Sequence, residues 1–169
     1  MSNYKRTTRV CSFEELKPTL QQAMRAYFSA HELSGLEAQV IMCCETRSER
    51  QKNSALSTLL GEDPDLVSYL AAFVTPEWLV WARSGDHTKT RVVAARLKDI
   101  HVKPLASLLL KDNGIHIEGF VEGAFSKIHG YLGLGLEPAA EEFWKAVEQA
   151  VDAVNPPRRL LDLFGKIPR

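Results

Sequence analysis

Five histidines are the side chains in this sequence that could carry metal or acid–base chemistry. They are His31, His87, His101, His116 and His129. They fall in separate predicted elements, and only His116 shares a strand face with an acidic residue, Glu118, at positions i and i+2. Two potential ligands are too few for a transition-metal site, which needs three or four. We therefore predict no metal site, no catalytic residue and no cofactor.

Three cysteines, Cys11, Cys43 and Cys44, are the next candidates for chemistry. They are too few for a disulfide framework, and adjacent residues such as Cys43 and Cys44 point to opposite faces of a strand. No Cys-x-x-Cys spacing occurs, and no positioned base accompanies either thiol. We expect buried thiols in a reducing, cytoplasmic protein.

Basic side chains form two groups that could hold phosphate. The first group is Arg47, Arg50 and Lys52, and the second, on a later hairpin, is Arg83, Lys89 and Arg91. Arginine and lysine bind phosphate oxygens through charge-assisted hydrogen bonds. Two glutamates interrupt the first group, so ordinary solvated surface is the competing interpretation.

The C-terminal tail combines apolar and basic residues. Its apolar side chains include Leu160, Leu161, Leu163 and Phe164, and arginines and lysine flank them. Such a segment could lie on a membrane or dock on a partner protein. Because it is short for an independent helix in water, we favour packing on its own domain or on a second copy.

Composition excludes several classes of protein. The 169 residues are 45% hydrophobic and 25% charged, which is typical of one globular domain with a proper core. The 21 basic and 21 acidic residues cancel, so no global field favours nucleic acid. The apolar stretches are shorter than a bilayer requires, which predicts a protein that does not span the membrane. Residues 1–9 lack the apolar core of a secretory signal and are expected to be a frayed start.

Two helices are predicted near the ends of the chain. Ser12 and Glu15 match a capping box, but Pro18 favours either a short turn before a helix or a kinked helix. The apolar spacing places this first helix at 18–31. A second helix is predicted at 138–154, with Pro138 as its first residue and a single apolar stripe that must pack on a core.

The segments between the helices have the residue types of β-strands. The candidates are 38–47, 66–74, 78–83, 90–97, the short pair 99–102 and 105–110 around Pro104, 115–120 and 125–134. Turn signals separate them, among them Thr75-Pro76-Glu77 and Asp112-Asn113-Gly114. Their regular spacing predicts a mainly β, α+β domain.

Several short sequence segments resemble those of bacterial pleckstrin-homology-like (PH-like) domains. The similar segments are Thr75-Pro76-Glu77-Trp78-Leu79-Val80-Trp81-Ala82, Leu97-Lys98-Asp99-Ile100, Gly114-Ile115-His116-Ile117 and the helix 138–154 with Phe143 and Trp144. The resemblance implies a seven-stranded antiparallel barrel at 38–154, capped by the C-terminal helix. It leaves 1–37 as an N-terminal extension with an added helix, and 155–169 as a tail.

The resemblance implies a binding role, because such domains hold phospholipid headgroups, peptides or partner domains. We predict a non-enzymatic binding or scaffold module that recognises another protein or a second copy of itself. The alternative is an anionic phospholipid or phosphate ligand at the loop after the first strand, which lipid-binding PH domains furnish with basic residues. The second alternative is a small-ligand carrier or cryptic enzyme, with a pocket between helix and barrel.

Overall fold

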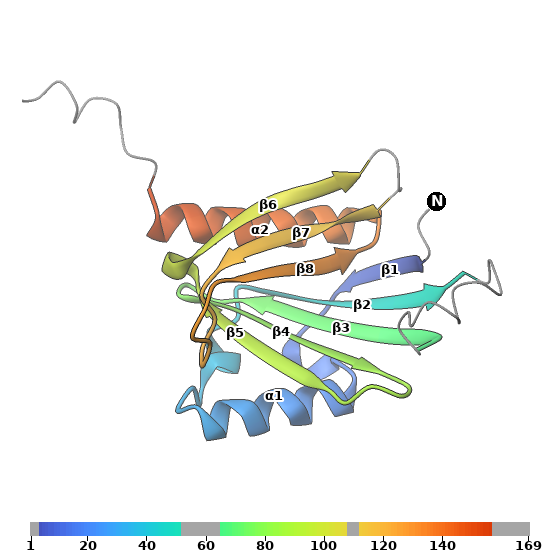
Figure 1. The fold of residues 1–169 in the computed structure, drawn as a ribbon, viewed down its shortest axis with the longest axis horizontal. Coiled ribbons are helices and arrows are strands. Elements are labelled where there is room, and N and C mark those ends of the chain that lie inside the picture. Colours follow the sequence, from blue (N-terminus) through green and yellow to red (C-terminus); the bar gives the residue numbers. More distant parts are fainter. Residues whose placement is uncertain (1–3, 52–64, 108–111, 157–169) are drawn as a thin grey trace, which may run out of the picture.

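A computed structural model describes residues 4–51, 65–107 and 112–156 (Figure 1). In chain order, its elements are β1 (Tyr4–Val10), η1 (Phe13–Glu15), α1 (Pro18–Ala30), η2 (Leu36–Gln39), β2 (Met42–Arg50), β3 (Val67–Val74), β4 (Trp78–Gly85), β5 (Arg91–Arg96), η4 (Leu97–Asp99), β6 (Ile100–Ser107), β7 (Asp112–Gly119), β8 (Ile128–Leu134) and α2 (Pro138–Val154). The mainly β, α+β class predicted from the sequence is confirmed.

The strands form two antiparallel sheets. The first sheet has the order β1-β2-β3-β4-β5, and the second has the order β6-β7-β8. The short turn η4 carries the chain from one sheet into the other. The prediction of a seven-stranded closed barrel is therefore wrong, because the eight strands of the described residues belong to two separate sheets.

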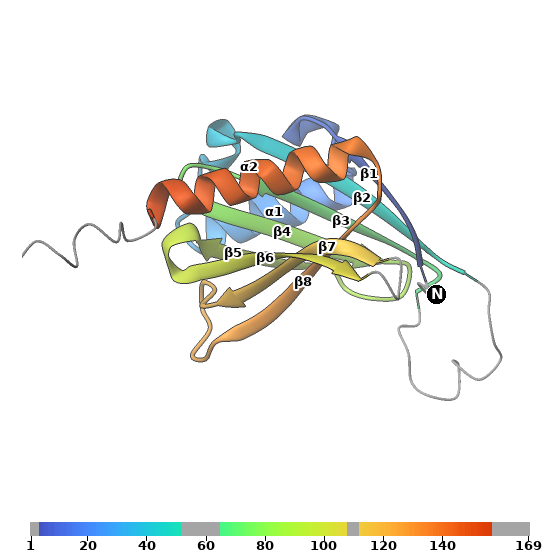
Figure 2. The same ribbon diagram turned by 90° about the horizontal axis from the view of Figure 1, so that it is seen from above.

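The central strands of the first sheet are buried on both faces, which explains their apolar sequence. Every residue from Leu70 to Thr75 is buried, on both sides of the pleat. One face packs against α1, with Leu20, Met24 and Phe28 in its core. The opposite face packs against the second sheet and α2, so that the two helices lie on opposite sides of the first sheet (Figures 1 and 2).

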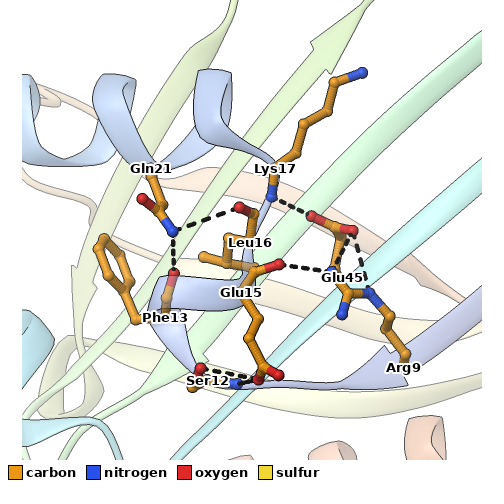
Figure 3. A network of polar contacts seen from close by, with 8 residues as sticks. All are labelled: Arg9, Ser12, Phe13, Glu15, Leu16, Lys17, Gln21 and Glu45. Atoms are coloured by element: carbon orange, nitrogen blue, oxygen red, sulfur yellow. Dashed lines mark hydrogen bonds and ion pairs between the residues drawn. The ribbon is translucent and has the colours of Figure 1, made fainter.

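The N-terminal segment is tied to the first sheet by a polar network (Figure 3). The Glu15 carboxylate accepts hydrogen bonds from the Ser12 N–H at 2.7 Å and the Ser12 hydroxyl at 2.9 Å. The expected capping-box pair therefore interacts, in the short turn η1. The alternative of a turn before a helix that starts at Pro18 is confirmed.

The C-terminal helix matches its prediction. It begins at Pro138, and its apolar stripe, including Phe143, Val147 and Val151, is buried between the two sheets. At its other end, the Asn155 amide donates a hydrogen bond to the Leu97 carbonyl at 2.9 Å. This bond fixes the end of α2 to the turn between the sheets.

Several predicted strand boundaries are wrong. Tyr4–Val10 is not a frayed start, because it pairs with β2 as an edge strand of the first sheet. The strand expected at 38–47 begins at Met42 and continues to Arg50. The turn expected at Asp112-Asn113-Gly114 is instead the start of β7.

Pro104 does not divide the segment that contains it, contrary to the two short strands expected there. Residues 100–107 form the single strand β6. Proline has no N–H to donate, and it is tolerated in a strand at the edge of a sheet. β6 is such an edge, since it pairs only with β7 among the described strands.

Candidate functional site

A polar cavity lies where the apolar core between the two sheets ends. Its volume is about 190 Å³, and it opens between the inner face of the first sheet and the edge strand β8. The lining residues are Tyr4, Arg6, Ser48, Ser68, Leu70, Arg83, Tyr131 and Gly133. We call this cavity the arginine pocket. Of the described residues that line it, two are arginines and none is acidic.

Arg6 is held between two aromatic rings. Its guanidinium carbon lies 5.5 Å from the centre of the Tyr4 ring and 5.6 Å from the centre of the Tyr131 ring. Cation–π attraction stabilises a guanidinium at such distances. Gly133 provides the room for this side chain, because an ideal Cβ at Gly133 would lie only 2.5 Å from the Arg6 Nε.

Burial lowers the pKa of Arg6, and the nearby positive charge of Arg83 lowers it further, while Tyr131 and Tyr4 raise it. Arginine still keeps its charge at neutral pH, because its ordinary pKa is so high. The charge of Arg83 therefore acts on a partly desolvated Arg6 guanidinium. An anion bound between them would interact favourably with both groups.

Strand register explains how the two arginines come to share one cavity. Arg6 lies directly opposite Ser48, and Ser48 lies opposite Ser68. Arg83 lies opposite Leu70, whose side chain belongs to the core between the sheets. These rows place Arg6, Arg83 and the largely buried Ser48 and Ser68 on the inner face of the sheet.

Tyr131 closes the pocket from the second sheet. Its hydroxyl donates a hydrogen bond to the Asn113 carbonyl oxygen at 2.8 Å, which fixes the ring across β7 and β8. Burial raises the pKa of Tyr131, so the phenol stays protonated at neutral pH. The ring therefore acts as a neutral wall beside Arg6.

This arrangement has the donors of an oxyanion-binding site. Two guanidinium groups supply planar forks of N–H donors, which match the geometry of phosphate and carboxylate. The serine hydroxyls can donate further hydrogen bonds. Among the described residues, no group of three or more histidine, cysteine or acidic side chains could hold a metal ion.

The structure separates the first group of predicted basic residues. Arg47 and Arg50 belong to β2 and not to a loop, and their positions three residues apart place them on opposite faces of the sheet. Arg47 forms an ion pair with Glu49. Lys52 lies outside the described residues, as do Leu160, Leu161, Leu163 and Phe164 of the tail.

The second predicted group contributes one residue to the arginine pocket. Arg83 lines it, and Arg91 is the cross-strand partner of Arg83 on β5. Lys89 is exposed between β4 and β5 and does not line the pocket. Sequence reasoning therefore identified Arg83 but missed Tyr4, Arg6 and Tyr131.

The local sequence of β1 offers only a weak signal for Arg6. Arg6 and Thr8 face inward in the structure, whereas Lys5 and Thr7 are exposed. The two β-branched threonines favour a strand, but the uniformly polar sequence does not indicate which face is buried. Nothing in the local sequence around Tyr131 indicates that it would meet Arg6, 125 positions earlier in the chain.

The cysteines and histidines lie apart from the arginine pocket. Cys43 and Cys44 point to opposite faces of the first sheet, as predicted, and belong to its two different cores. A hydrogen bond from Cys43 is the main cause that lowers the pKa of Cys11. His116 and His129 stack with ring centres 6.0 Å apart, a contact that the sequence did not reveal.

Comparisons of the chain with protein families, with curated proteins and with solved structures find no match. Within the described residues, neither helix is long and apolar enough to cross a membrane. The function must therefore be inferred from the site itself.

Proposed function

We propose that this protein is a non-enzymatic binding module that holds an oxyanion, a phosphate or a carboxylate, in the arginine pocket. The observation that carries the proposal is the convergence of Arg6 and Arg83 in one cavity with the hydroxyls of Ser48 and Ser68. Surface arginines usually point into water. These two instead line one cavity between the two sheets, where Arg6 is partly buried, so that fewer water molecules compete for its N–H groups, while Arg83 is exposed.

The pocket is also prepared for binding before a ligand arrives. Arg6 is restrained by the rings of Tyr4 and Tyr131 and by its close approach to Gly133. A restrained side chain loses less conformational entropy when it binds, so more of the interaction energy contributes to affinity. This supports a binding role for Arg6 in addition to its packing.

We further propose that the fold is PH-like in an open form. The four strands β2–β5, the three strands β6–β8 and the helix α2 follow one another in the order that the resemblance implies. β1 and α1 are additions to that pattern. The proposed anion site differs from the loop site that the resemblance suggested, because Arg47 and Arg50 lie on opposite faces of β2.

Recognition of a protein partner or of a second copy stays a prediction, together with the cytoplasmic location. The tail that would provide the contact lies outside the described residues. The anion proposal is supported by a specific cavity. It keeps the phosphate ligand that the sequence suggested as an alternative, but it places the binding site between the two sheets and not at the first inter-strand loop.

Titration with inorganic phosphate tests the proposal. We expect millimolar phosphate to raise the Tm at low ionic strength, because a ligand that binds only the folded state stabilises it by mass action. The substitution Arg83→Gln removes one of the two charges and should weaken phosphate binding about tenfold, or about 1.4 kcal/mol. Calorimetric titration measures the affinity directly.

Lys5→Gln is the matched control for Arg83→Gln. It removes the same charge from the neighbour of Arg6 on β1, but Lys5 is exposed and does not line the pocket. Phosphate also stabilises proteins in general through exclusion from their surface. An equal response of the wild type and both variants, or no binding by the wild type, would contradict the proposal.

A further inference from the structure

A second, larger cavity lies beside the arginine pocket. Its volume is about 590 Å³, and it follows the edge strand β5 from the C-terminal end of α1 to the start of β8. The lining residues are Tyr27, His31, Trp81, Arg91, Val92, Val93, Val121, Glu122, Gly123, Ile128, His129 and Gly130. We call it the β5 cavity.

The two cavities are neighbours along two strands. On β8, Gly130 lines the β5 cavity, and the next residue, Tyr131, which points to the opposite face of the strand, lines the arginine pocket. On β4, Trp81 lines the β5 cavity and Arg83, two positions later on the same face, lines the arginine pocket. Arg91, which lines the β5 cavity, is the direct cross-strand partner of Arg83.

The wall of the β5 cavity includes apolar side chains of the core between the sheets, beside the polar Arg91 and His129. Val93 and Ile128 are partly buried and pack against the core that contains Trp81. Gly130 leaves space over the Trp81 ring, because an ideal Cβ there would lie 3.8 Å from the Trp81 Cζ2. An apolar group in this cavity would contact an indole and two branched side chains.

The free edge of β5 is poorly suited to an added peptide strand. The Ala94 carbonyl accepts a hydrogen bond from the Glu122 N–H at 2.8 Å, and Tyr27 hydrogen-bonds to the backbone of Ala94. Addition of a strand requires a row of unpaired backbone groups, and Ala94 already interrupts this row. The β5 cavity therefore favours a small molecule over an extended peptide.

We propose that the ligand is an amphiphilic anion, with its oxyanion between Arg6 and Arg83 and its apolar body in the β5 cavity. This inference rests on the proposed function and adds the chemical class of the ligand. The arrangement of the two cavities determines the orientation of the ligand. Its charged group contacts the arginines, and its apolar body lies against Trp81, Val93 and Ile128. Both an acyl chain and an aromatic ring have this chemistry.

Three ligands of one phosphate series test the inference on the wild-type protein. They are inorganic phosphate, phenyl phosphate and octyl phosphate, each titrated by calorimetry. We expect at least one organic phosphate to bind about tenfold more tightly than inorganic phosphate, because its body buries apolar surface. Tighter binding of phenyl phosphate would identify a ring as the natural body, and tighter binding of octyl phosphate would identify an acyl chain.

A pair of variants assigns this gain to the β5 cavity. Ile128→Ala removes an apolar wall and should reduce the advantage of the organic phosphate severalfold, with little effect on inorganic phosphate. Phe125→Ala is the control, because Phe125 lies three residues before Ile128, in the connection between β7 and β8, but is fully exposed and does not line the cavity. This control should keep the full advantage.

The outcomes separate this inference from the proposed function. If inorganic phosphate binds through Arg83 and neither organic phosphate binds more tightly, the proposal of an amphiphilic ligand is overturned. The proposal that the arginine pocket binds an anion is then retained. If none of the three ligands binds, both proposals are overturned. An equal loss of the advantage in Ile128→Ala and Phe125→Ala would also overturn the assignment to the β5 cavity.

Discussion

Gly133 is the residue on which the position of Arg6 depends. Its missing side chain leaves room for the aliphatic and guanidinium atoms of Arg6, which an ideal Cβ would approach to between 2.5 and 3.1 Å. Such contacts are too short to persist, but the atoms concerned belong to the end of a flexible side chain. A methyl group at this position should therefore move Arg6 and leave the backbone of β8 in place.

We predict that Gly133→Ala weakens phosphate binding roughly tenfold, about 1.4 kcal/mol, with little change in Tm. The reason is that the guanidinium leaves its place between Tyr4 and Tyr131. Calorimetric titration with phosphate and thermal denaturation measure the two quantities separately. Gly130→Ala is the control on the same strand, because its Cβ would meet neighbouring atoms only at 3.6 Å or more. Unchanged phosphate affinity in Gly133→Ala would contradict this account of the pocket.

At the scale of elements, α1 is attached to the first sheet through Glu45 of β2 (Figure 3). The Glu45 carboxylate accepts a hydrogen bond from the Lys17 N–H at 2.7 Å, at the start of the helix. Its other oxygen accepts from Arg9 at 3.0 Å. A carboxylate at a helix N-terminus satisfies a free N–H and interacts favourably with the helix dipole.

We predict that Glu45→Ala lowers the free energy of unfolding by about 1 to 3 kcal/mol, since it leaves the Lys17 N–H without this acceptor. Urea denaturation measures the change. Glu49→Ala is the matched control on the same face of β2, where the exposed ion pair with Arg47 should contribute less than about 1 kcal/mol. A loss in Glu45→Ala no larger than that in Glu49→Ala would rule out Glu45 as an anchor of α1.

The elements that could be predicted from the sequence are those with strong local signals. Pro18 and Pro138 mark the starts of both α-helices, because proline fits the first turn and its missing N–H costs nothing there. β3 and β4 were predicted from their apolar runs. β1 was missed because its polar sequence has no apolar face, and its inward residues meet other polar groups across the sheet.

At the scale of the molecule, the arginine pocket is a product of how the two sheets meet. Arg6 and Tyr131 are 125 positions apart, and neither helical nor strand periodicity indicates that β1 and β8 lie side by side (Figure 1). Periodicity reports which face of an element is buried, but it does not identify the element that covers this face. Arg83 was therefore predicted as a basic residue, while its partner in the pocket was not.

The junction between the sheets is held by a buried polar contact next to the pocket. The Thr8 hydroxyl accepts a hydrogen bond from the Gly135 N–H at 2.7 Å, and it interacts with the Thr46 hydroxyl at 2.8 Å. The Thr8 N–H donates to the Glu137 carboxylate at 3.1 Å. These bonds satisfy the outer edge of β1 and connect it to the segment between β8 and α2.

Replacing Thr8 with valine tests whether this contact joins β1 to the segment between β8 and α2. Valine keeps the shape of threonine but leaves the buried Gly135 N–H without its acceptor, so we predict a loss of about 1 to 3 kcal/mol in unfolding free energy. Thr7→Val, the exposed neighbour on the opposite face, should change stability by less than about 0.5 kcal/mol. Hydrogen exchange of the Gly135 amide should accelerate in Thr8→Val alone. Similar stability and similar exchange in both variants would mean that the apolar core, and not this contact, joins the sheets beside the arginine pocket.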